Sequence, residues 1–422
     1  MSVPPKQRVA LLRREAIPES PSHYTRAGLR AVTDFLAETI GLCVDLRALC
    51  AGKRVLLKPN LVRPDPRNPQ AIVTDERVVL GLVSLCRDAG AREVWVGDNP
   101  GYGLSLAAAL SALGRFKEGL RRAGATLRYF DAEETVRLDN PEAVLFDPIV
   151  VPKALLEAEV YINVPKLKTH VHTLMTAGVK NQYGLVLDDQ RMFCHRNDIN
   201  LKVTDILRVI RPHVTVVDAI YAVQGQAPLS GSVVADCNVL VCGTDTAAVD
   251  TVCAQVMGFD PMEVPMLRII RSEGLGETDP DRIEVVGMAV AAVARPFRRP
   301  IIGCMGAYPE IFCLEGGACQ GCLSALRHAL DKLHAAGELS GRAVQTVYVG
   351  EPMPGMGSPR RIRGELWCFG DCAAKLLENA DTCRENAHCV PGCPPHILDF
   401  YKAYLARYTE KNGSCCVPKK IR

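Results

Sequence analysis

Short runs of β-branched residues alternate with amphipathic segments from residue 8 to about residue 290. This alternation constrains the fold most, because strands that take turns with helices form an α/β domain with a mostly parallel sheet. In such sheets, ligands bind beyond the carboxyl ends of the strands. The predicted strands are Arg8–Leu12, Arg54–Leu57, Glu93–Val96, Thr126–Phe130, Val160–Val164, Val214–Val217, Val239–Cys242 and Ile283–Val286. The predicted helices are Glu76–Ala89, Ser105–Arg122, Val203–Ile210 and Thr246–Met257, the last with Asp245 as its expected N-cap.

A proline-rich basic segment, Arg295-Pro-Phe-Arg-Arg-Pro300, marks the predicted end of this domain. We expect a mostly parallel sheet domain in residues 1–295, a smaller cysteine-rich iron–sulfur α/β region in residues 300–410, and a tail in residues 411–422. The elements expected in the second region are a helix at about Leu323–Ala336, a strand at Val344–Val349 and a closing helix from about His396 to Tyr408.

Cysteines concentrate in the second region, where residues 304–422 hold eleven of the chain's 18. Converging thiolates make a metal site, and soft sulfur ligands favour iron–sulfur clusters or zinc. Cys319-Gln-Gly-Cys322 opens a predicted helix, and the N-terminus of a helix stabilises thiolates. A redox-active dithiol, a zinc site and a disulfide framework are the alternatives to the favoured iron–sulfur cluster. The motifs are Cys319-Gln-Gly-Cys322, Cys368-Phe-Gly-Asp-Cys372 and Cys389-Val-Pro-Gly-Cys393-Pro-Pro.

This region resembles the cluster-binding core of the nickel–iron hydrogenase small subunit and of the related complex I subunit that carries the terminal cluster. The matching segments are Cys319 and Cys322, Cys372-Ala373, and Val390-Pro-Gly-Cys393-Pro-Pro. The resemblance implies one [4Fe–4S] cluster held by Cys319, Cys322, Cys372 and Cys393. The chain departs from the pattern by also carrying Cys368, Cys389, Cys304 and Cys313, which leave room for a second cluster.

A polar stretch from Asn163 to Gly184 follows one of the predicted strands. Lysines and amides at strand ends can bind a carboxylate or phosphate, and a histidine among them can transfer protons. We therefore expect a functional strand-end loop here, with a solvated basic loop as the alternative. The catalytic candidates are His170, His172, Lys168 and Lys180. The substrate-binding candidates are Lys58, Asn60, Asp98, Lys166, Asn181 and Asp218.

Much of residues 50–290 resembles the family called domain of unknown function 362. The resemblance implies an α/β fold and frequent association with iron–sulfur modules, but little about the reaction. Many relatives carry a ferredoxin-type run of four close cysteines, which this chain lacks. The matching segments include Val55-Leu-Leu-Lys-Pro-Asn-Leu-Val62, Val94-Trp-Val-Gly-Asp-Asn-Pro-Gly101, Val164-Pro-Lys-Leu-Lys-Thr-His170, Gly178-Val-Lys-Asn181 and Gly243-Thr-Asp-Thr-Ala-Ala-Val-Asp250.

Charge and hydrophobicity argue against several classes of protein. The formal net charge is only +3, without a run of five like charges, which does not favour nucleic-acid binding. No segment reaches the roughly 18 apolar residues of a membrane helix, and the N-terminal residues carry no export signal. We therefore expect a cytoplasmic protein with no nucleic-acid or membrane partner. In that compartment thiols serve metal or redox chemistry more often than disulfides.

Three functions are compatible with these features. The preferred one is an oxidoreductase whose cluster passes electrons, received from a donor protein such as a ferredoxin, to a small anionic substrate. Lys166, Lys168 and Lys180 would bind that substrate, and His170 or His172 would supply protons. The second is a non-catalytic electron-transfer or maturation partner, and the third a mononuclear-metal enzyme that uses the two histidines and has a structural cysteine region. The oligomeric state is open, with a homodimer as one alternative.

Overall fold

The computed structural model describes residues 5–18, 23–64, 72–101, 103–188, 190–191, 199–228, 230–303, 308–352, 362–378 and 387–411. Cys304 and the predicted tail beyond residue 411 lie outside these ranges. The described residues divide into two compact units, one up to Pro300 and the other from Ile301 onward, and each has its own hydrophobic core. No helix formed by the described residues is long and apolar enough to cross a membrane.

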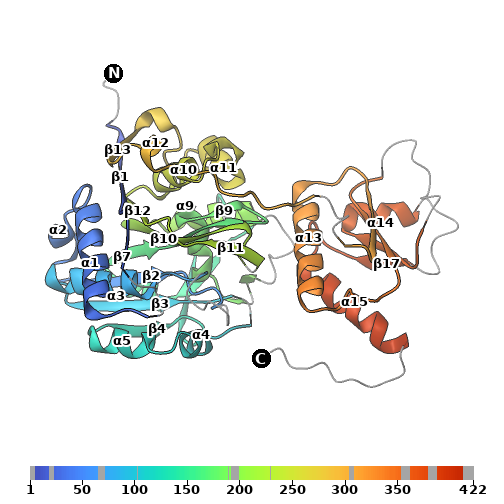
Figure 1. Ribbon diagram of the computed structural model, residues 1–422, viewed down its shortest axis with the longest axis horizontal. Helices are drawn as coiled ribbons and strands as arrows, with labels where there is room; N and C mark the ends of the chain where they lie inside the picture. Colours follow the sequence, from blue (N-terminus) through green and yellow to red (C-terminus); the bar gives the residue numbers. More distant parts are fainter. Residues whose placement is uncertain are drawn as a thin grey trace. The chain divides into compact units, whose positions relative to one another are not determined.

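An 11-stranded, mostly parallel sheet forms the centre of the first unit (Figure 1). Its strands are β1 (Gln7–Arg13), β2 (Arg54–Pro59), β3 (Glu93–Asp98), β4 (Thr126–Tyr129), β7 (Val160–Val164), β8 (Lys166–His170), β9 (Leu174–Thr176), β10 (Val214–Gln226), β11 (Ser230–Val234), β12 (Val239–Gly243) and β13 (Ile283–Gly287). They run in the order β13-β1-β12-β10-β7-β2-β3-β4, while β8 and β11 also pair with β10, and β9 pairs with β8. The pairs from β10 through β7, β2 and β3 to β4 are parallel, and β12 is antiparallel to both β1 and β10. A separate hairpin joins β5 (Thr135–Leu138) and β6 (Ile149–Pro152). The predicted α/β class with a mostly parallel sheet is therefore confirmed.

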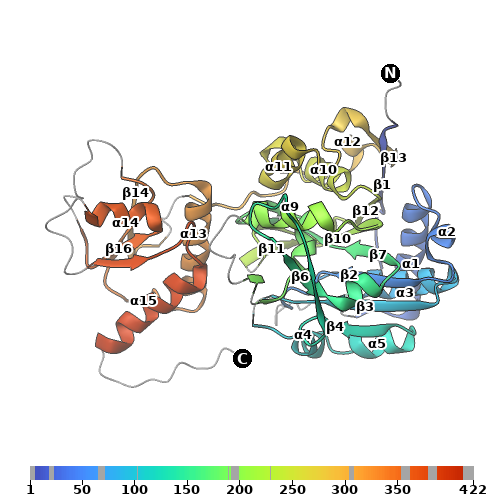
Figure 2. The same cartoon turned by 180° about the vertical axis from the view of Figure 1, so that it is seen from behind.

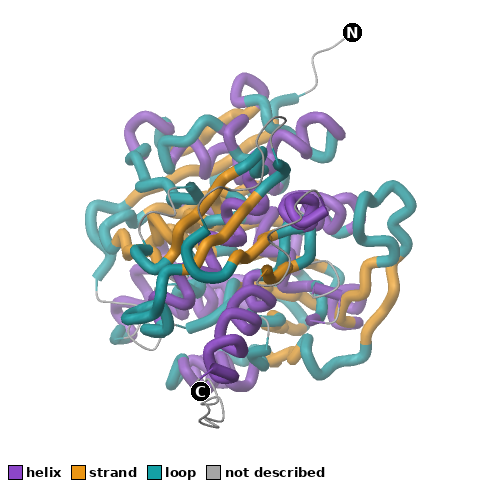
Figure 3. The backbone as a smooth tube through the Cα atoms, turned by 90° about the vertical axis from the view of Figure 1, so that its right-hand side faces the viewer, coloured by secondary structure: helices purple, strands orange, loops and turns teal. Residues whose placement is uncertain are grey.

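Helices cover both faces of this sheet (Figure 2, Figure 3). They are α1 (Arg26–Gly41), α2 (Leu46–Cys50), α3 (Glu76–Asp88), α4 (Leu106–Ala112), α5 (Phe116–Arg122), α6 (Lys153–Glu157), α7 (Gly178–Asn181), α9 (Ile199–Val209), α10 (Thr246–Val256), α11 (Pro265–Glu273) and α12 (Val290–Val293), with 3-10 turns η1 (Gln182–Leu185), η2 (Pro261–Glu263) and η3 (Pro280–Arg282). Alternate residues of a strand point to opposite faces. Ala10 of β1 packs in the core with α1 and α3, whereas Val9 lies with Val249 of α10 against Gly243. Asp245 caps α10 as predicted, because its carboxylate accepts the backbone N–H groups of Ala247 and Ala248.

Two predictions of local structure were wrong. The segment Ser105–Arg122 forms two helices, α4 and α5, because Gly114 between them adopts the left-handed conformation with φ +62°, which ends a helix. The stretch Lys166–His170 is not a loop but strand β8, fully buried and paired in parallel with β10 and antiparallel with β9. Two lysines of the expected loop therefore lie inside the molecule.

The second unit contains a four-stranded parallel sheet in the order β14-β15-β16-β17, where the strands are Ile311–Glu315, Gln345–Val349, Leu366–Phe369 and Ala387–Val390. Its helices are α13 (Gln320–Ala335), α14 (Asp371–Glu378) and α15 (Ile397–Lys411). Trp367, Phe369, Phe400 and Tyr404 form an aromatic cluster in the core between β16 and α15. The helix, strand and closing helix predicted from the sequence correspond to α13, β15 and α15.

Candidate functional site

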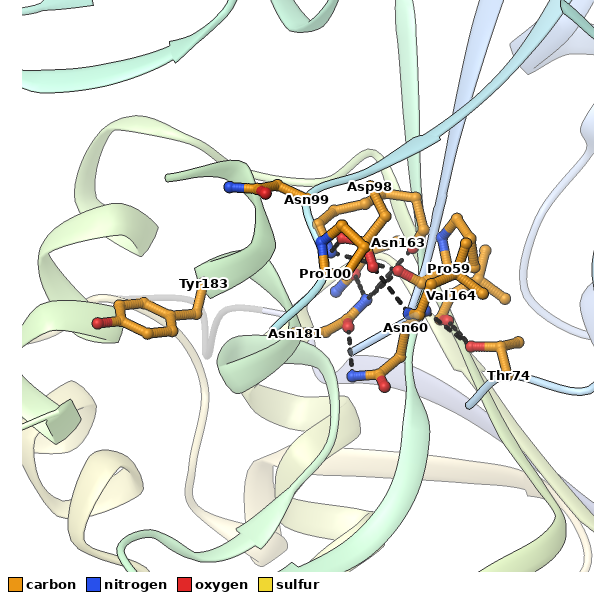
Figure 4. A network of polar contacts seen from close by, with 12 residues as sticks. Pro59, Asn60, Thr74, Asp98, Asn99, Pro100, Asn163, Val164, Asn181 and Tyr183 are labelled. Atoms are coloured by element: carbon orange, nitrogen blue, oxygen red, sulfur yellow. Dashed lines mark hydrogen bonds and ion pairs between the residues drawn. The ribbon is translucent and has the colours of Figure 1, made fainter. Parts of the chain in front are cut away.

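Polar side chains gather where β2, β3 and β7 end, next to the short helix α7 (Figure 4). These three strands are parallel neighbours, so Lys58, Asp98 and Asn163 leave the sheet along one edge. The next strand, β10, contributes Asp218 and is paired there with Lys166 of β8. The predicted substrate-binding residues are thus brought to the edge at which parallel sheets bind ligands.

Lys58 and Asp98 form a buried ion pair, with 2.7 Å between Nζ and Oδ1. The second carboxylate oxygen of Asp98 accepts the backbone N–H of Leu61 at 2.7 Å. Burial lowers the pKa of Lys58, and the attraction of Asp98 opposes that shift. Gly184 lies against the pair, where an added Cβ would overlap both side chains. The two charges are therefore engaged with each other and enclosed by backbone.

Lys166 and Asp218 form a second buried pair, with Nζ 2.9 Å from Oδ2 and neither side chain exposed. The Asp218 carboxylate also accepts the backbone N–H groups of Asp75, at 2.7 Å, and Ile220, at 3.0 Å. Burial raises the pKa of Asp218, while Lys166 opposes the shift. Because Asp75 is the N-cap of α3, this pair fixes the start of that helix against the sheet.

Three asparagines are linked by amide hydrogen bonds at the strand ends (Figure 4). The Asn181 amide donates to Asn163 Oδ1 at 2.8 Å and to the Lys58 carbonyl at 3.2 Å. Asn181 Oδ1 accepts from Asn60 Nδ2 at 3.0 Å, and Asn163 Nδ2 donates to the Gly178 carbonyl at 2.8 Å. The network therefore ties α7 to β2 and β7 and uses up most of the hydrogen-bonding capacity of its members.

A buried aspartate holds the first turn of α7. Asp250 of α10 accepts the backbone N–H groups of Gly178, at 2.6 Å, and Val179, at 3.0 Å. Burial raises the pKa of Asp250 to about 7, against the lowering effect of these two hydrogen bonds. Gly178 is required at this contact, because a Cβ there would lie 2.6 Å from Thr246 Cγ2. Asp250 thereby positions the helix that carries Lys180 and Asn181.

Lys168 is buried without a carboxylate partner among the described residues. Its Nζ donates to Asn60 Oδ1 at 3.2 Å and to the Ile72 carbonyl at 3.3 Å. Burial, followed by repulsion from Lys180 and Lys166, lowers the pKa of Lys168 to about 7. An anion bound beside this amine would restore its proton, because a nearby negative charge favours the ammonium form.

Lys180 lies on α7 with partial exposure and over the ring of Tyr183, 5.1 Å from the ring centroid. Burial, and repulsion from Arg191, Lys58 and Lys202, lower its pKa to about 7. Arg191 is buried, donates to the Asn99 carbonyl at 2.7 Å and to that of Pro100, and lies 3.4 Å from the Asp188 carboxylate. Arg191 was not predicted from the sequence, where no strand or motif precedes it.

The two histidine candidates lie at the turn after β8. His170 ends the strand, His172 lies in the turn, and their ring centroids are 5.5 Å apart. The backbone N–H of His172 donates to His170 Nδ1 at 3.1 Å. A neutral His170 ring therefore carries its proton on Nε2. The two rings therefore lie at the end of β8 and in the turn that follows it.

Three buried side chains near the lysines keep polar atoms without a hydrogen-bond partner in the described part of the chain: Tyr161, Thr176 and Gln182. Thr176 is the cross-strand partner of Lys168, and Gln182 follows Asn181 directly. Burial and the nearby Asp98 charge raise the pKa of Tyr161. Unsatisfied buried polar groups are rare in folded proteins and indicate a place for water or a ligand.

In the second unit, four of the predicted metal ligands come together from three segments. Cys319 precedes α13, Cys322 lies in its first turn, Cys372 lies in the first turn of α14, and Cys393 follows β17. The thiols of Cys319 and Cys322 are hydrogen-bonded, and burial and the charges of Cys319, Cys393 and Cys372 raise the pKa of Cys322. Burial and the charges of Cys372 and Cys319 likewise raise the pKa of Cys393.

The other cysteine candidates occupy strands. Cys368 and Cys389 are register partners on β16 and β17 and share a side-chain hydrogen bond, while Cys313 lies on β14, where burial raises its pKa to about 12. Across the described ranges, no group of three or more His, Cys, Asp or Glu side chains has the placement needed to hold a metal ion. The four gathered thiols interact, but they do not meet that geometric requirement as they stand.

Comparison with known proteins bears mainly on the first unit. Residues 55–255 match the protein family described as Domain of unknown function (DUF362), which confirms the predicted resemblance over that range. A thylakoid-associated protein of Synechocystis sp. is 28% identical over 245 residues, covering 54% of this chain and 70% of that protein. The likeness of the cysteine region to hydrogenase subunits stays a prediction.

Two solved structures show distant similarity. The lactate racemase apoprotein from Thermoanaerobacterium thermosaccharolyticum is 12% identical with a TM-score of 0.38, over 60% of this chain and 57% of that one. A protein from Thermotoga maritima is 11% identical with a TM-score of 0.30, over 52% of this chain and 55% of that one. These matches span little more than half of either chain.

Proposed function

We propose that the chain is an iron–sulfur oxidoreductase. In this proposal the second unit holds a [4Fe–4S] cluster, and the strand ends of the first unit bind a small anionic substrate. The observation that carries it is the gathering of Cys319, Cys322, Cys372 and Cys393, in which the charges of the neighbouring thiols raise the pKa of Cys322 and Cys393. A bound cluster would supply single electrons.

The four cysteine thiols are suitable ligands for such a cluster. Thiolates repel one another, and binding to iron removes that repulsion because the metal offsets their charge. The first turn of α13, with Cys319 before it and Cys322 within it, adds exposed backbone N–H groups that favour a negatively charged cluster. Zinc would also accept four thiolates, so the proposal depends on the metal that the protein binds.

The anion site rests on the surplus of positive charge at the strand ends. Lys58 and Lys166 are neutralised by Asp98 and Asp218, whereas Lys168 and Lys180 have no carboxylate partner among the described residues. Two buried or half-buried amines without counterions are costly, and an anionic substrate would offset that cost. His170 remains the candidate proton donor through Nε2.

The accompanying roles are proposals of the same kind. An electron-donor protein such as a ferredoxin would reduce the cluster, and a homodimer is one arrangement of the chain. A cytoplasmic location also stays a proposal, since one relative is named as thylakoid-associated. The electron-transfer-partner and mononuclear-metal alternatives gain no specific support from the residues described.

The deciding experiment measures iron, acid-labile sulfide and zinc per chain after purification without oxygen, followed by an EPR spectrum of the dithionite-reduced protein. We expect about four iron and four sulfide per chain, and about eight if the remaining cysteines hold a second cluster. The C319S and C393S variants should lose the signal, whereas C389S, which changes another exposed cysteine, should keep one cluster. One zinc without sulfide would overturn the redox proposal.

A further inference from the structure

We infer that Lys180 is a nucleophile that forms an imine with the carbonyl carbon of a small anionic aldehyde or ketone, such as a 2-oxo acid. This inference rests on the proposed anion site and deepens it by naming the substrate class. It assigns different tasks to the two lysines that have no carboxylate partner among the described residues: Lys168 attracts the negative group, and Lys180 attacks the carbonyl.

The surroundings of Lys180 are those of a reactive amine. Lys58, Lys166 and the exposed Lys153 each have a carboxylate within 3 Å of Nζ, but the described residues offer Lys180 neither a carboxylate nor a hydrogen-bond acceptor. Its charged neighbours are the cations Arg191, Lys58 and Lys202. An ammonium group is disfavoured in such a place, and the free amine is the nucleophilic form.

The lowered pKa of Lys180 greatly increases its fraction of free amine at neutral pH. With a pKa of about 7 instead of 10.5, Lys180 is mostly a free amine at pH 7.5, whereas an ordinary lysine holds only about one part in a thousand. Lys180 is also partly exposed, unlike the buried Lys58, Lys166 and Lys168. Buried lysines with carboxylate partners lack both properties.

The neighbourhood can also hold the rest of such a substrate. Lys168 lies close enough to Lys180 for the two amines to repel each other, which places a cation near the nucleophile. When an anion restores its proton, Lys168 gains a third N–H beyond the two that reach Asn60 and Ile72. Thr176, opposite Lys168 on β9, and Gln182 supply buried polar atoms that lack partners among the described residues.

The chemical step is balanced without any redox reagent. The Lys180 Nζ lone pair forms a C–N bond to the carbonyl carbon, and the carbonyl C–O bond then breaks. The oxygen leaves as water together with the two amine hydrogens, and a C=N bond remains. Asp250 and the asparagine network hold α7 in place during this step, because they bond both ends of that helix.

The test traps the imine by reduction. Full-length protein purified without oxygen is incubated at pH 7.5 with pyruvate or glyoxylate and sodium cyanoborohydride, and the adduct is located by mass spectrometry of the intact chain and its peptides. We expect one adduct per chain at Lys180, formed roughly a hundredfold or more faster than at Lys153. The K180R variant keeps a cation but cannot form an imine, and it should lose this adduct, while K153R should retain it.

The opposite results separate this inference from the proposed anion site. Absence of an adduct, or adducts at equal rates on many lysines, overturns the imine. Calorimetric binding of oxalate, which bears two carboxylates and no ketone, then reports on the anion site alone. If oxalate binds and K168M weakens that binding, the proposed anion site is supported although the imine is not. If oxalate does not bind, both the anion site and the imine are overturned. Circular dichroism of K180R at the same temperature confirms that the variant is folded.

Discussion

At the scale of single residues, the four lysines at the strand ends have two kinds of surroundings. Lys58 and Lys166 are fully paired with Asp98 and Asp218 and hold strand ends together. Lys168 and Lys180 lack such partners in the described part of the chain, and their pKa values fall to about 7. Retaining unpaired amines in such a place lowers stability, which is typical of functional sites.

The lowered pKa of the buried Lys168 predicts a specific dependence of stability on pH. Between pH 7 and 10.5 the unfolded chain holds a proton on Lys168 that the folded chain lacks, so the free energy of unfolding rises with pH by at most about 1.4 kcal/mol per unit from this group. The K168M variant should lose that part of the slope. Urea unfolding followed by circular dichroism at pH 7, 8 and 9 measures it. K153M, at an exposed lysine, should retain the wild-type slope, and an unchanged slope in K168M would contradict the prediction.

At the scale of elements, the short helix α7 depends on its surroundings. With four residues it has almost no stability of its own. Asp250 binds its first turn, Asn163 accepts from its last residue, and Gly178 allows the close approach of Thr246. The position of Lys180 therefore depends on tertiary contacts and not on helix propensity.

Gly178→Ala should displace this helix. The added Cβ would meet Thr246 Cγ2 at 2.6 Å and Thr215 Cγ2 at 2.9 Å, and overpacking of this kind costs about 1–3 kcal/mol. Gly41→Ala, at the end of α1, meets nothing within 4 Å and should be neutral or stabilising by up to about 1 kcal/mol. Denaturant unfolding compares the two variants, and trapping at Lys180 should fall only in G178A. Equal stability of both variants would argue against tight packing at this helix.

Strands and helices with regular apolar patterns were predictable, whereas β8 was not. All eight predicted strands of the first unit are present, because their β-branched runs are the segments that the sheet buries. Lys166-Leu-Lys-Thr-His170 looks exposed, since lysines are rarely buried without partners. The burial of Lys166 depends on its ion pair with Asp218 of β10, which is distant in the sequence. The burial of Lys58 likewise depends on Asp98. The sequence therefore predicts which residues meet at the strand ends, but not which of their charges lack a partner within the described part of the chain.

At the scale of the whole molecule, the lysine site and the gathered cysteines lie in two units with separate hydrophobic cores. The lysine site belongs entirely to the first unit, and the gathered cysteines entirely to the second. A ligand that binds only the folded form of a unit stabilises that unit. Metal binding and anion binding should therefore act on different parts of the unfolding behaviour.

Scanning calorimetry of the full-length protein should accordingly show two transitions. Removal of the proposed metal, or the C319S variant, should lower the temperature of one transition, because the thiolates of the second unit then repel one another without a cation. G178A should lower only the other transition, since its clash lies within the first unit. G41A serves as the control that moves neither transition downward. A single transition shifted by both C319S and G178A would mean that the two units unfold cooperatively, and the separate cores would then not define independent folding units.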